Sequence, residues 1–313
     1  MQTMEKKATR QGYGDGLVDL MKEKSDVVVL DADLCHATGT LAVRKEFPGR
    51  FVNVGIAEQN LVGMAVGMAR VGYVPFASSF AVFLAGRGGE IIRNCAAYSN
   101  TNVKFAGSHA GITAAGDGGS HQCIEDLGAM RAIPNMTVLS PCDYNQAKAL
   151  VRLAYEVKGP VYIRTSREPV PMLTAPDQDI AIGKAQLLRE GGDLCIIATG
   201  FPVSLALEAA DALARQGVGA AVLNIHTVKP LDRDAILAQA GACGRVLVVE
   251  EHNVYGGLSE AVAAALVGVD GLQFDRWAVQ DRFGQSGLTD ELLDEYGMTA
   301  AHIQQRALAL LRD

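Results

Sequence analysis

Three side chains that can exchange protons or bind hydroxyl groups share one glycine-rich segment, GSHAGITAAGDGGSHQCIED (107–126). His109 follows an apolar run, and Asp117 and His121 precede a helix predicted at about 122–132. Two imidazoles and a carboxylate on one loop could orient substrate hydroxyls, shuttle protons or bind a metal. The alternative is a loop whose histidines cap a helix and contact water. The histidine spacing matches no common zinc site, so we expect no metal ligand here and favour contact with a substrate.

Glu58 stands in the run NVGIAEQN (53–60), where apolar residues precede it and mostly small or apolar residues follow it. A carboxylate in apolar surroundings costs several kcal/mol to desolvate unless it is paired, hydrogen-bonded or protonated. Glu58 therefore either lies at a solvent-exposed position or is required there by a specific interaction.

Two aromatic residues and two arginines complete the set of candidates. Phe80 and Phe83 are three residues apart at the start of a predicted helix, so they lie on one face. Such pairs usually belong to the hydrophobic core, but small neighbours leave room for a flat ligand against the rings.

Arg164 and Arg167 end a predicted strand, where guanidinium groups suit a phosphate or carboxylate. An interdomain salt bridge is the alternative.

The elements that must position these residues alternate between short apolar runs and helical patterns. This alternation predicts a mostly parallel sheet with helices on both faces and a ligand site beyond the carboxyl ends of the strands. Predicted helices include 57–70, 81–98 and 143–157. The predicted strands are 26–33, 51–55, 74–79, 103–108, 136–141 and 160–166.

The pattern restarts after a proline-rich stretch without periodicity, 169–183. Further apolar runs at 193–200, 219–225 and 245–251, with a helix at 204–217, predict a second, smaller parallel-sheet domain. The fold class is therefore α/β with two domains, each a mostly parallel sheet flanked by helices. We place the first domain at 1–173, the linker at 174–191 and the second domain at 192–313.

The composition excludes several classes of protein. A net charge of −7 without a basic block argues against a nucleic-acid surface. No apolar run is long enough to cross a bilayer, so we expect no membrane partner. The polar N-terminus lacks the apolar core of a signal peptide, and the six cysteines show no paired spacing. We therefore expect a cytoplasmic protein with reduced thiols.

In this order, the motifs resemble those of the transketolase family, over its pyrimidine-binding domain and its smaller C-terminal domain. The combination is specific and spans nearly the whole chain. The matching stretches are DADL (31–34), GIAEQN (55–60), SSFAVF (78–83), SHAGITAAGDGGSHQ (108–122), IPNMTVLSPCD (133–143), TSR (165–167) and QDRFGQSG (280–287).

The resemblance implies a role for Glu58 and for the residues around it. Glu58 would meet the ring nitrogen N1′ of the aminopyrimidine of thiamine diphosphate and relay a proton that activates the cofactor. Phe80 and Phe83 would line the pyrimidine pocket, and Asp33 would support the cofactor site. The implied reaction is transfer of a two-carbon ketol unit from a ketose phosphate to an aldose.

The resemblance also implies how the sugar is held. His109, Asp117 and His121 would contact substrate oxygens, with the histidines serving proton transfer or hydroxyl orientation. Arg10 and Arg167 match positions that hold the sugar phosphate.

At two positions the sequence departs from the family. Ala37 stands where many transketolases have a phosphate-binding serine, and Gly86 stands where an aromatic residue commonly extends the pyrimidine pocket.

The resemblance implies a partner as well. The family's diphosphate-binding domain, which holds Mg²⁺ and the cofactor's diphosphate, has no equivalent here. A separate N-terminal subunit is therefore expected, in an α2β2 assembly. Two other functions remain open: the beta subunit of a 2-oxo acid dehydrogenase's decarboxylating component, and a non-catalytic relative that binds a partner or senses a metabolite.

Overall fold

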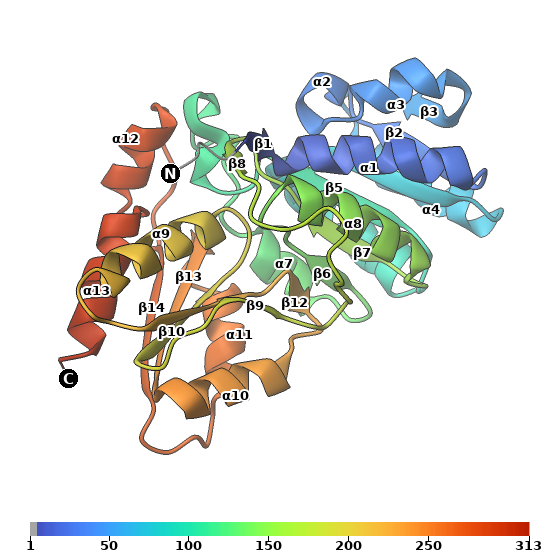
Figure 1. The fold of residues 1–313 in the computed structure, drawn as a ribbon. Helices are drawn as coiled ribbons and strands as arrows, with labels where there is room; N and C mark the ends of the chain where they lie inside the picture. Colours follow the sequence, from blue (N-terminus) through green and yellow to red (C-terminus); the bar gives the residue numbers. More distant parts are fainter. Residues whose placement is uncertain (1–4, 313) are drawn as a thin grey trace.

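The computed structural model describes residues 5–312 and places them in two α/β domains (Figure 1). Residues 1–4 and 313, at the ends of the predicted domains, lie outside the described part. The predicted fold class is confirmed, because parallel pairs dominate two separate sheets.

The first sheet has seven strands in the order β12-β6-β7-β5-β4-β2-β3. The pairs are parallel except at β12, which joins β6 antiparallel from the second half of the chain. All six predicted strands are present. The bounds are β2 Val27–Asp31, β3 Phe51–Asn53, β4 Val74–Phe80, β5 Lys104–Ser108, β6 Thr137–Leu139, β7 Val161–Arg164 and β12 Thr227–Lys229.

Helices cover both faces of this sheet, as expected for strands that are apolar along their whole length. Helices α1 (Thr9–Glu23) and α8 (Tyr144–Glu156) lie side by side on one face, with Tyr13 and Leu150 in their shared core (Figure 1). The other face carries α4 (Glu58–Arg70), α5 (Ala81–Arg87) and α7 (Asp126–Ala132). The short helices are α2 Cys35–Thr38, α3 Leu41–Glu46 and α6 Gly89–Ile91, and a π-helical turn spans Ile92–Ala97.

Two predicted helices differ from the structure. The stretch 81–98 is broken into α5, α6 and the π-helical turn, and the interruption falls at the GRGG run that ends α5. Helix α7 begins at Asp126 rather than near residue 122, because Cys123 pairs with Ala110 and Gly111 as isolated β-bridges. The residues before α7 are thereby tied to the loop that follows β5.

The second sheet has five strands in the order β14-β13-β10-β11-β9. Helices α9 and α13 cover one face, and α10 and α11 cover the other. The strands are β9 Gln186–Arg189, β10 Leu194–Ala198, β11 Ala220–Asn224, β13 Arg245–Asn253 and β14 Gln273–Val279. The helices are α9 Pro202–Ala214, α10 Arg233–Cys243, α11 Leu258–Ala265, α12 Thr289–Glu295 and α13 Ala300–Leu310.

The predicted linker, 174–191, contains one of these strands. β9 pairs antiparallel with β11 and forms an edge of the second sheet. Just before the linker, β8 (Pro169–Pro171) pairs antiparallel with β1 (Lys6–Ala8). The strands β1 (KKA), β8 (PVP) and β9 (QLLR) lack the continuous apolar run by which the predicted strands were identified.

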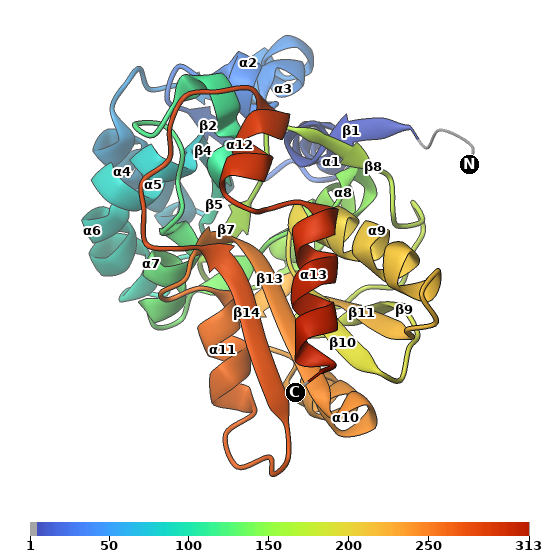
Figure 2. The ribbon, with the colours of Figure 1, turned by 90° about the vertical axis from the view of Figure 1, so that its left-hand side faces the viewer.

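The two domains share an apolar core. One continuous cluster joins Phe105 and Leu127 of the first domain to Ile225 and Val248 of the second. Between β14 and α12 the chain crosses back over the first domain (Figure 2), where Gly118 and Gly119 touch Ser286 and Gly284. Within residues 5–312, no helix combines the length and apolarity needed to span a membrane.

Candidate active site

The order of the strands determines the order of the candidate residues. Arg167 follows β7, His109 follows β5, Phe80 ends β4, Asp33 follows β2, and Glu58 lies beyond β3. These strands are neighbours in the sheet, in the order β7-β5-β4-β2-β3, and run parallel. Their carboxyl ends therefore place all five residues along one edge of the sheet.

Four of the predicted site residues form an aromatic cluster at this edge. The rings of Phe80 and Phe83 are stacked, with centroids 5.9 Å apart and planes 8° from parallel. The imidazole of His109 stacks on Phe80 at 4.0 Å, and His121 meets Phe83 edge-on at 5.3 Å. Phe80 and His109 are buried, whereas Phe83 and His121 are partly exposed. The cluster therefore offers an aromatic wall with two imidazoles beside it.

His109 is held in an unusual conformation directly after β5. Its φ is 57°, and its Nδ1 is 2.8 Å from the hydroxyl oxygen of Ser108. Burial, assisted by the nearby charges of Arg10 and Arg167, lowers the pKa of His109 from 6.5 to about 3. The imidazole is therefore neutral near pH 7 and can act as a hydrogen-bonding group toward a hydroxyl.

The two arginines near His109 form a positively charged spot. Arg10 donates to the carbonyl of Ala37 at 2.8 Å, and Arg167 donates to the carbonyl of Ala114 at 2.8 Å. Arg167 also pairs with Asp117 at 3.3 Å. Burial lowers the pKa of Arg10, and the charge of Arg167 adds to that effect, so the two guanidinium groups are close to each other. Such a pair suits an anionic ligand.

Glu58 is buried at the beginning of α4, with its side chain only 4% exposed. Its Oε1 has no hydrogen-bond partner among residues 5–312, and its Oε2 is 3.6 Å from the guanidinium of Arg87. The helix dipole also favours a negative charge at this position. Glu58 faces an open hollow of about 490 Å³, which is lined by Ile56, Ala57, Glu58, Gln59, Asn60 and Arg87.

Arg87 was not among the residues predicted from the sequence. Its guanidinium lies over the ring of Phe83, 4.8 Å from the ring centre, and so joins Glu58 to the aromatic cluster. The spacing in the sequence could have indicated Arg87, because Phe83 and Arg87 are four residues apart on one helix and so lie on the same face. At Gly86 an added Cβ would touch nothing within 4 Å, so this side of α5 is open.

The end of β2 carries two aspartates with different surroundings. Asp33, the predicted cofactor-site residue, is exposed, has a φ of 65°, and accepts a hydrogen bond from Asn53 at 2.7 Å. Asp31 is fully buried and accepts from the backbone of Leu34 and the hydroxyl of Thr38. Sequence reasoning missed Asp31, which organises the loop that carries Asp33.

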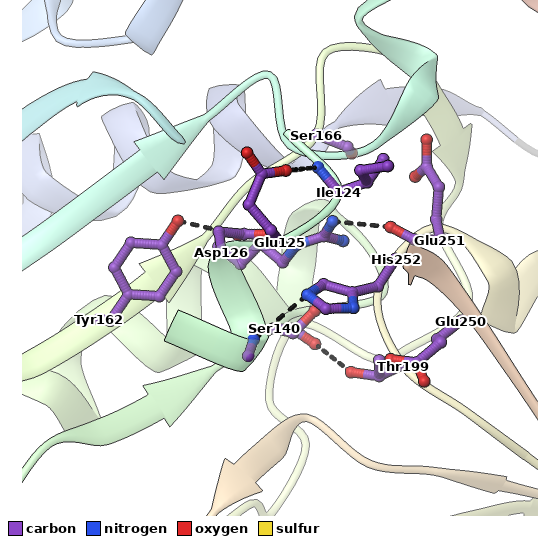
Figure 3. A network of polar contacts seen from close by, with 12 residues as sticks. Ile124, Glu125, Asp126, Ser140, Tyr162, Ser166, Thr199, Glu250, Glu251 and His252 are labelled. Atoms are coloured by element: carbon purple, nitrogen blue, oxygen red, sulfur yellow. Dashed lines mark hydrogen bonds and ion pairs between the residues drawn. The ribbon is translucent and has the colours of Figure 1, made fainter. Parts of the chain in front are cut away.

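Arg164, predicted to contact substrate, points into the interior instead. Its side chain is 5% exposed, its Nε donates to Asp126 at 3.0 Å, and its Nη2 donates to the carbonyl of Glu251 at 2.8 Å. Tyr162, on the same face of β7, also donates to Asp126 (Figure 3). The alternative, a solvated interdomain salt bridge, is also not what the structure contains: the ion pair with Asp126 is buried and lies within the first domain, and the hydrogen bond to the carbonyl of Glu251 reaches the second domain. We therefore leave Arg164 out of the candidate site.

Across residues 5–312, no group of three or more histidine, cysteine, aspartate or glutamate side chains is placed to hold a metal ion. All six cysteines are free thiols.

The two domains and this site define a known class of protein. The family model described as Transketolase, pyrimidine binding domain, matches residues 5–172, and the model described as Transketolase, C-terminal domain, matches residues 183–303. The chain belongs to the transketolase family. It corresponds to the C-terminal section of such enzymes, a pyrimidine-binding domain followed by a C-terminal domain.

Individual relatives support this assignment. The chain is 44% identical to a putative transketolase C-terminal section from Methanocaldococcus jannaschii, over 96% of each chain. It is 43% identical to the 6-deoxy-6-sulfo-D-fructose transketolase subunit SqwH of a Clostridium species, over 95% of this chain and 92% of that one. A solved structure described as a split gene transketolase, inactive beta4 tetramer, has 46% identity and a TM-score of 0.91, over 97% of this chain and 98% of that one.

The chain spans about half the length of transketolases that are single polypeptides. It is 38% identical to human transketolase over 98% of this chain, which is 49% of the human protein.

Proposed function

We propose that this chain is the C-terminal subunit of a thiamine diphosphate-dependent transketolase, in which Glu58 activates the cofactor. The observation that carries the proposal is the buried Glu58 carboxylate, whose Oε1 lacks a partner among the described residues and which faces an open hollow. A buried carboxylate oxygen without a hydrogen bond is costly, so a ligand that donates to Oε1 is the physical reason we give for its presence.

The residues around Glu58 fit the aminopyrimidine part of the cofactor. A flat heterocycle needs a hydrogen-bonding group for its ring nitrogen and an aromatic surface for its face. Glu58 offers the first, and Phe83 and Phe80 offer the second. The planar guanidinium of Arg87 already contacts both Glu58 and Phe83, so a planar ring of similar width can bridge them as well. When bound, thiamine diphosphate supplies a nucleophilic carbon and an electron sink.

The roles of the remaining residues follow from their positions. Glu58 holds and returns a proton at the ring nitrogen that it meets. His109 is neutral and, with His121, orients the hydroxyl groups of the sugar and moves protons to and from its oxygens. Asp117 accepts from a sugar hydroxyl while it holds Arg167. Asp33 stands at the adjacent strand end, beside the cofactor site.

We assign the terminal phosphate of the sugar to Arg10 and Arg167. Their guanidinium groups lie close together, and each is anchored by a backbone carbonyl. Ala37 contributes only its carbonyl to this arrangement, so the arginines supply the charge-assisted contacts. A sulfonate could use the same two cations, because it is also a tetrahedral anion.

The proposed partner is a separate N-terminal subunit that carries the diphosphate-binding domain and Mg²⁺, in an α2β2 assembly. Relatives named as a C-terminal section and as a transketolase subunit support this proposal. So does the relative solved as a tetramer of one kind of chain, which is described as inactive.

Reconstitution tests the proposal. The chain is mixed with a candidate N-terminal subunit, thiamine diphosphate and Mg²⁺, and ketol transfer from xylulose 5-phosphate and from 6-deoxy-6-sulfofructose is followed. We expect transfer from at least one of these ketoses. If 2-oxo acid decarboxylation occurs instead, the chain is the beta subunit of an oxo acid dehydrogenase component. If no partner gives catalysis but a regulator binds tightly, the chain is a non-catalytic relative.

A further inference from the structure

The C-terminal domain reaches the loop that carries His109 and Asp117 through one buried carboxylate. Glu251 lies in β13, is 1% exposed, and its Oε1 accepts a hydrogen bond of 2.6 Å from the backbone N–H of Thr113. Its Oε2 has no partner within residues 5–312. The two residues are far apart in sequence and belong to different domains, so this contact ties one domain to the other.

Gly111 makes room for this carboxylate. Its φ is +85°, and an added Cβ would lie 2.2 Å from the Cδ of Glu251 and closer than 3 Å to both carboxylate oxygens. A side chain at this position would therefore displace Glu251 or the loop. The loop after His109 and the carboxylate are packed in direct contact.

The same loop is held at its other end by Arg167. Residues Ile112–Asp117 form a short 3-10 segment with a kink at Ala115, where φ is 57°. Before the kink, the N–H of Thr113 donates to Glu251. The carbonyl of the adjacent Ala114 accepts from Arg167, which also pairs with Asp117 beyond the kink. Glu251 and Arg167 therefore fix the segment from two sides, one from each domain. Because Thr113 and Ala114 are adjacent, a shift at the contact with Glu251 must also shift the contact with Arg167.

Glu251 is surrounded by few charged groups. Arg164 on β7 and Asp126 on α7 face it from the first domain, and His252, its neighbour on β13, is directed to the backbone of Gly128 instead. Burial raises the pKa of Glu251 to about 7, which Arg164 opposes and Asp126 assists. The carboxyl group therefore changes its charge near physiological pH, and with it the strength of its bond to Thr113.

We propose that Glu251 is a positioning residue, through which the C-terminal domain sets the location of the His109–Asp117 segment toward the sugar. The inference rests on the proposed function for its catalytic consequence, but the contact itself can be tested in the chain alone. It gives the C-terminal domain a role in the reaction without a residue that touches the substrate.

Glu250 provides a matched control. It is an equally buried carboxylate on the same strand, and its side chain points the opposite way (Figure 3). Both of its oxygens accept from backbone N–H groups at the beginning of α11, at Leu258 and Ser259, within the C-terminal domain. Glu250→Gln therefore removes a buried charge from β13 without touching the loop.

Hydrogen–deuterium exchange of the free chain is the first measurement. In Glu251→Gln, we expect amides of residues 110–117 to exchange about fivefold faster, because a neutral acceptor replaces a charged one. Glu250→Gln should leave this segment unchanged and speed exchange at the start of α11 instead. If Glu251→Gln does not fold, Glu251→Asp keeps the charge but withdraws it from Thr113 and should show the same local change. Unchanged exchange in a folded Glu251 variant overturns the proposal.

Kinetics of the reconstituted enzyme are the second measurement. Glu251→Gln should lower kcat/KM for the ketose about tenfold at pH 8, while exchange of the cofactor's C2 proton stays at the wild-type rate. The ratio of variant to wild-type kcat/KM should rise toward one below pH 7, where the wild-type carboxyl group is protonated as well. A ratio that stays constant with pH, or faster loop exchange without a kinetic effect, would overturn the positioning role. A wild-type complex that is inactive on every sugar refutes the proposed function, and the exchange data then decide on the contact alone.

Discussion

The guanidinium of Arg87 lies 3.6 Å from the carboxylate of Glu58, at the mouth of the hollow that both residues line. Arg87 is 59% exposed, whereas Glu58 is 4% exposed, so an exposed surface cation pairs with a buried anion. The same guanidinium covers Phe83. Arg87 therefore covers the face of Phe83 and lies at Oε2 of Glu58, next to the Oε1 that we assign to the cofactor's aminopyrimidine, and we expect it to move aside when the cofactor binds.

Arg87→Met tests this competition. Methionine keeps an apolar stem over Phe83 but removes the charge. An exposed ion pair contributes at most about 1 kcal/mol, so we expect thiamine diphosphate to bind the reconstituted enzyme about threefold to fivefold more tightly, measured by titration calorimetry. Arg93→Met, which removes an exposed cation whose guanidinium donates to Asn94, should leave the affinity unchanged. Weaker binding to Arg87→Met would mean that Arg87 helps to hold the cofactor.

Arg167→Ala tests the assignment of the sugar phosphate. A charge-assisted hydrogen bond contributes about 1.5–3 kcal/mol, so KM for a phosphorylated ketose should rise at least about tenfold. KM for the unphosphorylated ketose should rise less, because that sugar loses only the support that Arg167 gives to Ala114 and Asp117 and no ionic contact. Arg152→Ala, on the exposed surface of α8 where Arg152 pairs with Glu23, is the control. Equal increases for both sugars would place the phosphate elsewhere.

Arg164→Met tests the structural role of the buried ion pair. Removal of one partner leaves the charge of Asp126 buried, which costs about 3–5 kcal/mol of unfolding free energy. The double variant Arg164→Met, Asp126→Leu should recover part of that loss. The exposed pair Arg152–Glu23 should cost less than about 1 kcal/mol when broken. Urea denaturation measures the unfolding free energy of the variants of both pairs. If breaking the Arg164–Asp126 pair costs as little as breaking the Arg152–Glu23 pair, the structural role assigned to Arg164 is contradicted.

His109 gives a prediction on pH. Because burial lowers its pKa from 6.5 to about 3, the folded chain binds fewer protons here than the unfolded chain, and the stability that this residue contributes is lost as the pH falls below 6.5. Relative to His109→Asn, the wild-type chain should lose about 2 kcal/mol of unfolding free energy between pH 7 and pH 5. An NMR titration of His109 with a midpoint above pH 5 would contradict this prediction.

Much of the fold could be predicted from local sequence, because buried parallel strands are continuous apolar runs. Val27–Leu30 and Leu194–Ala198 are examples, and the strands they form are interior strands that have a neighbour on each side. The pairing of β12, from the second half of the chain, with the sheet of the first half could not be predicted. β12 joins the first sheet from beyond the linker, and its partner β6 is far away in sequence, so no local pattern records the pairing.

The candidate site shows the same division. Glu58, Phe80, Phe83, His109 and His121 stood out because their types and local surroundings were unusual, and the last four lie together in the structure. Arg164 and Arg167 could not be told apart, since both end the same strand. Arg164 is buried because it binds Asp126 and the backbone carbonyl of Glu251, and these partners come from other elements. Glu251 was missed because only the docking of the second domain gives it a partner in the loop.

The most direct test is the rate of proton exchange at C2 of thiamine diphosphate bound to the reconstituted enzyme with Glu58→Gln, followed by NMR without any sugar. Glutamine fills the same space but cannot return a proton to the ring nitrogen, so exchange should slow by orders of magnitude while the cofactor still binds. Glu90→Gln, an exposed carboxylate on the neighbouring helix α6, should exchange at the wild-type rate. Unaltered exchange in Glu58→Gln, with the cofactor bound, would contradict the account.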